Sequence, residues 1–140
     1  GERRVIHRER SGFEAPNWSR DGQQFFINRD GGIFTVPVAG GEPRRLNTGA
    51  VDHHNNDHGL SGDGRWLALS AGRGENGSQV YVVPSTGGEP RRVTPAGPSY
   101  WHGWSPDGRT LLYCAKRNGN FDIYAIPAAG GAEQRLTTAD

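Results

Sequence analysis

Histidine is the residue type whose spacing in this sequence points to chemistry. His58 stands five residues before Asp63, and His102 stands five residues before Asp107, so the two imidazoles occupy equivalent positions in a repeat. Asp57 directly precedes His58. Imidazole is a ligand of divalent transition metals such as Zn, Mn, Ni and Cu, and carboxylates also bind them. The spacing therefore predicts a metal site formed by His58, His102 and Asp57, with a divalent transition metal as its cofactor.

The same region supports two other interpretations. Tyr100 and Trp101 precede His102, Asn56 lies close to His58, and Glu14 occupies the corresponding part of the first repeat. Aromatic rings and amide or carboxylate groups recognise peptides and sugars by stacking and hydrogen bonding. These four residues therefore predict a ligand site for a protein segment or a sugar. In the third interpretation the histidines are structural and hydrogen-bond neighbouring turns.

Other sequence features do not indicate catalysis. The repeated serines Ser19, Ser61 and Ser105 are not in a Gly-x-Ser-x-Gly elbow, so a serine hydrolase is not predicted. The glycine-rich run at residues 72–77 lacks the Gly-Lys-Ser/Thr ending of a phosphate loop. No neighbouring feature activates Cys114 as a nucleophile. The sequence gives no firm basis for an enzyme, and a binding function is favoured.

A repeat determines where these residues must lie. Asp-Gly pairs recur at Asp21, Asp63 and Asp107, each two residues after a serine. An apolar run, a turn and a second apolar run ending in proline follow each pair. A Gly-Gly turn and a short Arg-apolar segment then close the unit. The period of about 42 to 47 residues is typical of propeller blades, and four short strands per period make one blade.

The alignment divides one propeller domain, residues 1–140, into four parts. Residues 1–12 are predicted to be the outer strand of a preceding blade. Residues 13–49, 50–97 and 98–140 are predicted to be blades 1, 2 and 3. The fold class expected is therefore all-β, a propeller of four-stranded antiparallel blades with one orphan outer strand.

The run Trp-Ser-Pro-Asp-Gly at residues 104–108, with Ile-Tyr-Ala-Ile-Pro at residues 123–127, resembles the PD40 (WD40-like) repeat of TolB-like β-propellers. The first two copies have Arg20 and Gly62 in place of the proline. The resemblance covers essentially the whole chain and implies a binding or interaction scaffold. A weaker likeness, to propeller lyases that act on uronate sugars, implies a metal-dependent carbohydrate-active enzyme with an axial site lined by histidines.

Three blades do not close a ring, since propellers typically have four to eight. TolB-like propellers usually have six blades, so two chains related by a twofold axis would complete the ring as a homodimer. The chain contains no methionine, even at position 1, and its ends coincide with blade boundaries. We therefore also expect that it could be an engineered or excised half-propeller without activity of its own.

Composition limits the partners. There are 16 Lys and Arg against 15 Asp and Glu, a net charge of +1, which gives no electrostatic basis for nucleic-acid binding. No stretch approaches the roughly 20 apolar residues of a membrane span, so a soluble protein is expected. With the single cysteine Cys114, cysteine usage does not distinguish a cytoplasmic from a periplasmic location.

Overall fold

The computed structural model describes residues 3–10, 12–72 and 76–138, and within these ranges the chain forms twelve β-strands and no helix. The first eight strands are β1 (Glu14–Trp18), β2 (Gln24–Arg29), β3 (Gly32–Pro37), β4 (Arg44–Arg45), β5 (His54–Leu60), β6 (Trp66–Ala71), β7 (Gln79–Pro84) and β8 (Arg91–Arg92). The last four are β9 (Ser99–Trp104), β10 (Thr110–Arg117), β11 (Asn120–Pro127) and β12 (Gln134–Arg135).

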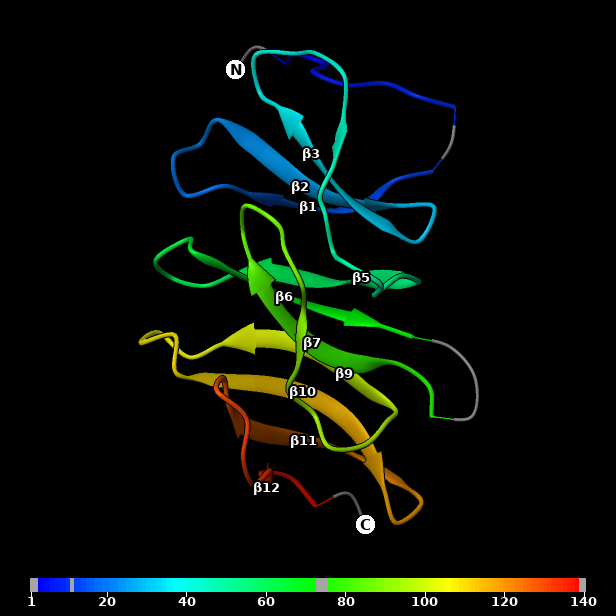
Figure 1. Ribbon diagram of the computed structural model, residues 1–140, viewed down its shortest axis with the longest axis vertical. Coiled ribbons are helices and arrows are strands. Elements are labelled where there is room, and N and C mark those ends of the chain that lie inside the picture. Colours follow the sequence, from blue (N-terminus) through cyan, green and yellow to red (C-terminus); the bar gives the residue numbers. More distant parts are fainter. Residues whose placement is uncertain (1–2, 11, 73–75, 139–140) are drawn as a thin grey trace.

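The strands form three separate four-stranded sheets in which each strand pairs antiparallel with its neighbour in sequence. We call them blade 1 (β1–β4), blade 2 (β5–β8) and blade 3 (β9–β12). The blades stack in chain order along the long axis of the molecule, with the two termini at opposite ends (Figure 1). The predicted all-β propeller architecture is confirmed. No helix in the described part of the chain is long and apolar enough to cross a membrane.

The repeated Ser-x-Asp-Gly run forms the same turn in every blade. In blade 2, Ser61 Oγ donates to Asp63 Oδ1 at 2.6 Å and accepts the backbone N–H of Trp66 at 3.1 Å. Equivalent bonds join Ser19 to Asp21 and Ser105 to Asp107. The hydrogen bond from Ser61, together with that from the Arg65 backbone N–H, holds the pKa of the Asp63 carboxyl well below its usual range. Among the side chains of this run, only those of Ser and Asp make these hydrogen bonds, which explains why the residue between them can vary.

Strand residues alternate between two faces, and this alternation builds two cores between the blades. We call the face of a blade that points to the next blade its forward face, and the opposite one its backward face. Phe26, Ile33 and Leu46 on the forward face of blade 1 pack on Leu67, Leu69, Ala71 and Val83 of blade 2. Ala68, Val80, Val82 and Val93 on the forward face of blade 2 pack on Leu111, Tyr113, Ala115, Tyr124 and Ile126 of blade 3. The stack therefore leaves one apolar face uncovered by another blade at each end.

The outer strands are short. The exposure of the apolar residue that follows each of them depends on whether a further blade packs against it. Leu46 and Val93 are only 8% and 6% exposed, because each lies in the core between two blades. Leu136, the equivalent residue of blade 3, is 50% exposed. The difference follows from position in the stack, since no described residue packs against the forward face of blade 3 as a further blade would.

Residues 3–10 and 12, the described part of the segment predicted to be an outer strand, have no strand structure. A β-strand requires a partner, and no described strand pairs with these residues. The segment instead lies along blade 1, where Arg4 Nη2 donates to the carbonyl oxygen of Val38 at 2.6 Å.

Candidate functional site

The predicted site residues lie on β1, β5 and β9, the innermost strands of the three blades. β5 contacts both β1 and β9, so the three strands are neighbours along the inner edge of the stack. Each has an irregularity in its pairing, but not at the same residue: the register shifts between Glu14 and Asn17 in β1, between His54 and His58 in β5, and opposite Leu112 and Tyr113 in β9. Bulges of this kind turn a side chain away from the direction that regular alternation would give it. The local irregularity is thus a repeated feature of the inner strands.

The bulges give the two equivalent histidines different environments. In blade 3, Gly103 pairs with Leu112 and Trp101 with Tyr113, so His102 lies between two paired residues and is exposed. In blade 2, His58 pairs directly with Leu69 and is only 3% exposed. Equivalence in the sequence therefore does not place the two imidazoles side by side.

His58 belongs to the interface between blades 1 and 2. Its Nε2 lies 3.4 Å from the carbonyl oxygen of Phe26 in blade 1, and its Nδ1 is buried. Burial lowers the pKa of His58, because the interior disfavours the charged imidazolium. The environment is that of a neutral histidine packed between two sheets.

Among the predicted metal ligands, Asp57 and His102 are near enough for the charge of one to affect the other. Burial raises the pKa of the Asp57 carboxyl, and the neighbouring His102 partly offsets this increase. Asn55 Oδ1 accepts the backbone N–H of Asp57 at 2.9 Å and stabilises the bulge. A partly buried carboxylate beside an exposed imidazole can bind a cationic or hydrogen-bonding group.

The described residues contain no group of three or more His, Cys, Asp and Glu side chains placed to hold a metal ion. His58 lies in the interface between blades, whereas His102 and Asp57 lie at the inner edge. A site built from these three residues within one chain is not assembled by this geometry. The metal site stays a prediction.

The four predicted ligand-binding residues separate into two groups. Glu14 and Asn56 are exposed on the inner strands, and Tyr100 is half-buried opposite Cys114. Trp101 has a different role, since its ring lies against Gly59 and packs on the core between blades 2 and 3. Its backbone N–H donates to Ser70 Oγ at 2.7 Å. Glu14, Asn56 and Tyr100, with Asp57 and His102, are therefore polar residues of the inner edge.

A groove between blades 2 and 3 was not anticipated from the sequence. It has a volume of about 210 Å³ and is lined by Trp66, Val82, Arg91, Trp104, Gly108, Ala128 and Ala129. Trp66 takes the position of Gln24 and Thr110 in the other repeats, and this departure from a polar residue is the signal that could have revealed the groove. Trp104, one of the lining residues, donates Nε1–H to the Gly59 carbonyl at 3.0 Å.

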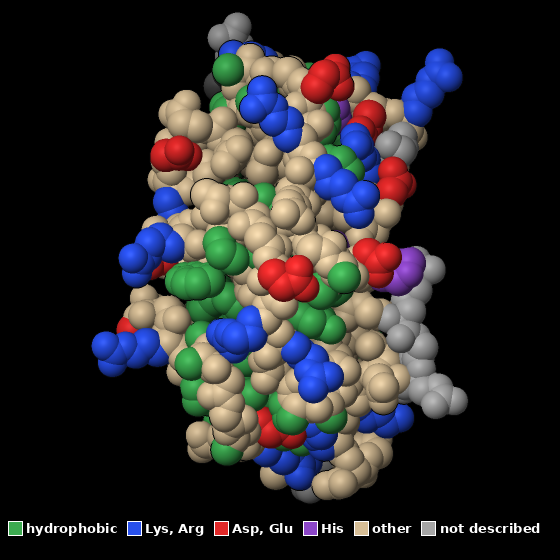
Figure 2. All heavy atoms as spheres, in the orientation of Figure 1, with side chains coloured by type: hydrophobic (Ala, Val, Ile, Leu, Met, Phe, Trp, Pro, Cys, Tyr) green, Lys and Arg blue, Asp and Glu red, His purple; other side chains and the backbone are tan. Residues whose placement is uncertain are grey.

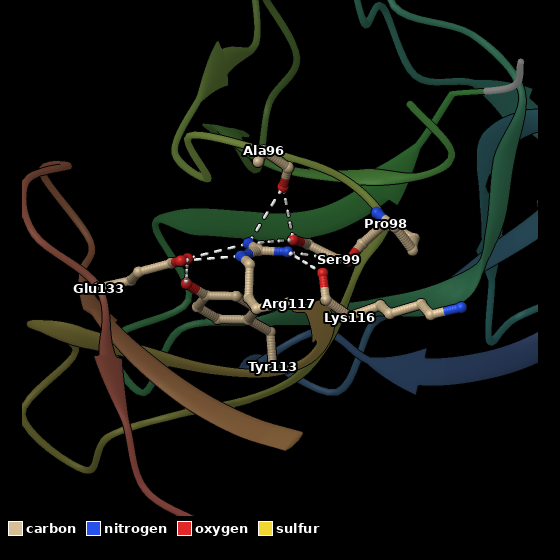
Figure 3. A network of polar contacts seen from close by, with 7 residues as sticks. All are labelled: Ala96, Pro98, Ser99, Tyr113, Lys116, Arg117 and Glu133. Carbon is tan, nitrogen blue, oxygen red and sulfur yellow. Dashed lines mark hydrogen bonds and ion pairs between the residues drawn. The ribbon is translucent and has the colours of Figure 1, made fainter. Parts of the chain in front are cut away.

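A dense polar network among the described residues ties the segment between β8 and β9 to blade 3. Arg117 makes a paired contact with Glu133, from Nε to Oε1 at 2.8 Å and from Nη2 to Oε2 at 2.9 Å, and Tyr113 donates to the same carboxylate at 2.6 Å (Figure 3). Arg117 also donates to Ala96 O and Ser99 Oγ in the connecting segment. The Arg117 guanidinium lowers the pKa of the Glu133 carboxyl. Every group in this network has a partner, so its role is to position β9.

The surface charge is mixed. Positive and negative side chains are interspersed over the face drawn in Figure 2, and apolar side chains gather over blades 2 and 3. No single-sign field of the kind that attracts nucleic acid is evident there.

Two proteins from Agrobacterium are similar to this chain. An uncharacterized protein of Agrobacterium fabrum is 45% identical over 135 residues, which cover 96% of this chain and 46% of the relative. A solved structure described as a candidate TolB of Agrobacterium tumefaciens is 45% identical, with a TM-score of 0.90 and coverage of 96% of this chain and 49% of that one. The chain thus spans about half the length of both proteins.

More distant structures share the fold. TolB of Acinetobacter baumannii is 19% identical with a TM-score of 0.76, and the match covers 95% of this chain and 34% of that one. No protein-family model matches the chain, so the assignment of its repeat to PD40 stays a prediction. The blade topology and these similarities together establish that the chain has a TolB-like β-propeller fold, present as three four-stranded blades.

Proposed function

We propose that this chain is one half of a six-bladed binding scaffold, and that a second copy completes the ring. The observation that carries the proposal is the pair of apolar faces at the two ends of the stack. Leu136 is 50% exposed on blade 3, whereas its equivalents Leu46 and Val93 are buried between blades. A surface that is core elsewhere in the same molecule is suited to pairing with another blade.

The two end faces of the stack, one backward and one forward, match each other as the faces inside the chain do. Forward faces pack on backward faces in both cores of the chain. The backward face of blade 1 carries Phe25, Ile27, Phe34 and Val36, at the positions of Leu111, Tyr113, Tyr124 and Ile126. The forward face of blade 3 carries Leu112, Cys114, Ile123 and Ala125. Two copies would form this contact twice around a twofold axis and so close the ring.

Ring closure would turn the inner edge into the wall of a central channel. Glu14, Asn56, Asp57, Tyr100 and His102 would then surround the channel mouth, each present twice. Carboxylate, amide, phenol and imidazole groups at one mouth suit a polar ligand, such as an extended protein segment or a sugar. Binding there, with no chemical step, is the function we propose. This geometry does not favour a metal-dependent lyase, since His58 Nε2 lies against the Phe26 carbonyl oxygen in the interface between blades 1 and 2.

Sedimentation velocity with multi-angle light scattering tests the proposal. We expect a concentration-dependent species of twice the 15.2 kDa chain mass. Leu112→Glu places a charge on the forward face of blade 3 and should abolish this species, because the charge would be buried in the interface. The monomer should still fold, since the Leu112 side chain is partly exposed in it. Thr86→Glu adds the same charge on an exposed turn of blade 2 and should leave it unchanged. A chain that stays monomeric at all concentrations would contradict the proposal.

A further inference from the structure

The segment of residues 3–10 lies against the backward face of blade 1, the face that ring closure requires. Ile6 and His7 line an apolar cavity of about 230 Å³ there, together with Phe13, Pro16, Phe25, Ile27 and Val36. Phe25, Ile27 and Val36 belong to the face that a second copy would cover. The segment therefore packs against the same surface that a second copy would bind.

The segment holds its place as an outer strand holds the next blade. Arg4 Nη2 donates to the carbonyl oxygen of Val38 at 2.6 Å. Arg91 of β8 donates in the same way to the carbonyl oxygen of Ala128 in blade 3, also at 2.6 Å. Val38 and Ala128 each follow the proline that ends the third strand of their blade. Arg4 thus takes the place, on blade 1, that Arg91 takes on blade 3.

By this equivalence, Ile6 is the residue of the segment whose side chain points toward blade 1. Val93 is two residues after Arg91 and is buried between blades 2 and 3, and Ile6 is two residues after Arg4 and lines the cavity. Val5, which the repeat spacing alone would align with Val93, is 67% exposed. A shift of one residue along an extended segment exchanges the side chains that face in and out, which accounts for the difference.

A second anchor holds the far end of the segment. Arg29 Nη1 contacts Glu9 Oε2 at 2.6 Å, and His7 Nε2 lies 3.3 Å from the same oxygen. The His7 and Phe13 rings are 5.5 Å apart. The ion pairs lower the pKa of the Glu9 carboxyl against the effect of burial. Contacts at Arg4 and Glu9 therefore fasten both ends of the segment to blade 1.

Only one such residue can occupy each groove between blades. Leu46 fills the position between blades 1 and 2, and Val93 fills that between blades 2 and 3. In a closed ring, Leu136 of the second copy would fill the position beside blade 1 that Ile6 occupies here. The two side chains exclude each other by volume, because a packed core does not accommodate an additional side chain without strain.

We infer that residues 3–10 form a strap that competes with a second copy of this chain for the backward face of blade 1. The inference rests on the proposed ring. In the strapped state the segment covers the face, and the ring opens or fails to form. In the assembled state the strap is displaced and Leu136 of the second copy takes the place of Ile6. The cavity between the strap and blade 1 shows that the strap covers the backward face only in part. Displacement of the strap by a second copy would therefore replace a partial contact with a fuller one.

Removal of residues 1–6 tests the strap. The dissociation constant of the dimer, measured by sedimentation equilibrium, should fall at least tenfold relative to the full chain. A point variant provides a second test that leaves the chain length unchanged. Arg4→Ala breaks the bond to Val38 and should lower the dissociation constant several-fold, whereas Arg8→Ala removes an exposed arginine of the same segment and should not change it.

The outcomes separate the strap from the ring. Equal dissociation constants for the full chain and the deletion overturn the strap and leave the ring intact. Weaker dimerisation of the deletion also overturns the strap, since it would show that residues 1–6 belong to the interface. A monomer in every case, with circular dichroism confirming the fold, overturns the ring itself.

Discussion

The indole of Trp101 in blade 3 lies directly over Gly59 in blade 2. A Cβ atom at residue 59 would stand 2.8 Å from Cζ3 of that ring and closer still to Cη2. The inner strands of blades 2 and 3 can approach this closely because residue 59 has no side chain. Gly103 holds the same position in blade 3, and a Cβ there would meet nothing within 4 Å.

Gly59→Ala should therefore lower the free energy of unfolding by about 1–3 kcal/mol, the usual cost of overpacking. Gly103→Ala is the matched control and should change it by less than about 0.5 kcal/mol, because the added Cβ would contact nothing. Urea denaturation followed by tryptophan fluorescence measures both. Equal effects of the two substitutions would show that the indole adjusts freely and that the contact does not position the blades.

Stability should fall in mild acid because of the two buried histidines of β5. Burial lowers the pKa of His54 to about 4, and it also lowers that of His58. Between an unfolded pKa of about 6.5 and these folded values, the unfolded chain binds more protons than the folded one. The stabilisation is therefore complete above pH 6.5 and is lost as the pH falls toward 4. For His54 alone the loss is on the order of 3 kcal/mol.

Urea unfolding at a series of pH values measures this dependence. His53→Gln is the control, since His53 is exposed and adjacent to His54. His54→Gln should make the decline between pH 4 and 6.5 shallower, because Gln does not titrate, whereas His58 still contributes. A wild-type profile with no decline over this range would contradict the buried, neutral state of the imidazoles.

Arg117→Ala should destabilise the junction of blades 2 and 3. The substitution leaves the Glu133 carboxylate and the Ala96 carbonyl without their charged partner. Because the ion pair is partly screened by solvent, the expected loss of unfolding free energy is about 2 kcal/mol. Lys116→Ala, at the adjacent exposed position, should cost less than about 0.5 kcal/mol. Thermal melting of both variants at neutral pH gives the comparison, and equal melting temperatures would refute a structural role for the network.

Cys114 offers a probe of ring closure, because it is the single cysteine and lies on the forward face of blade 3. Burial raises the pKa of its thiol, and Asp122 and Asp57 raise it further. Its reaction with a disulfide reagent at pH 8 should slow at least tenfold as the protein concentration rises and the face is covered. The Leu112→Glu variant should react at a rate independent of concentration. A constant rate in both proteins, despite dimerisation, would place the interface elsewhere.

The Ser-x-Asp-Gly turns and the strands beside them could be predicted because they depend on neighbours in the sequence. Ser61 and Asp63 are two residues apart and bond to each other and to the backbone between and after them. Gly64 follows with φ of +72°, a value that favours glycine. Alternation of Leu67, Ala68 and Leu69 then assigns their faces without reference to the rest of the chain. Local hydrogen bonding and a period of two are sufficient for this part of the fold.

The candidate site could be predicted only in part. The repeat assigns Glu14 to the first strand of blade 1, and Asn56 and Asp57 to the first strand of blade 2, and they lie in β1 and β5. The side chains of His58 and His102 diverge because the bulge differs between β5 and β9, and no residue type in the sequence specifies a bulge at that point. Trp101 turns to packing because Gly59, 42 residues earlier in the chain, leaves room for its ring.

The repeat, the three blades of this chain and their turns could be read from the residue order, because they depend on contacts between near neighbours. Which histidine is buried, which tryptophan is packed and which face each end of the stack presents could be seen only once the sheets were packed together. These properties depend on how one sheet fits against the next. The position of residues 3–10 on blade 1 is of the same kind, since a one-residue shift places Ile6 rather than Val5 against the sheet.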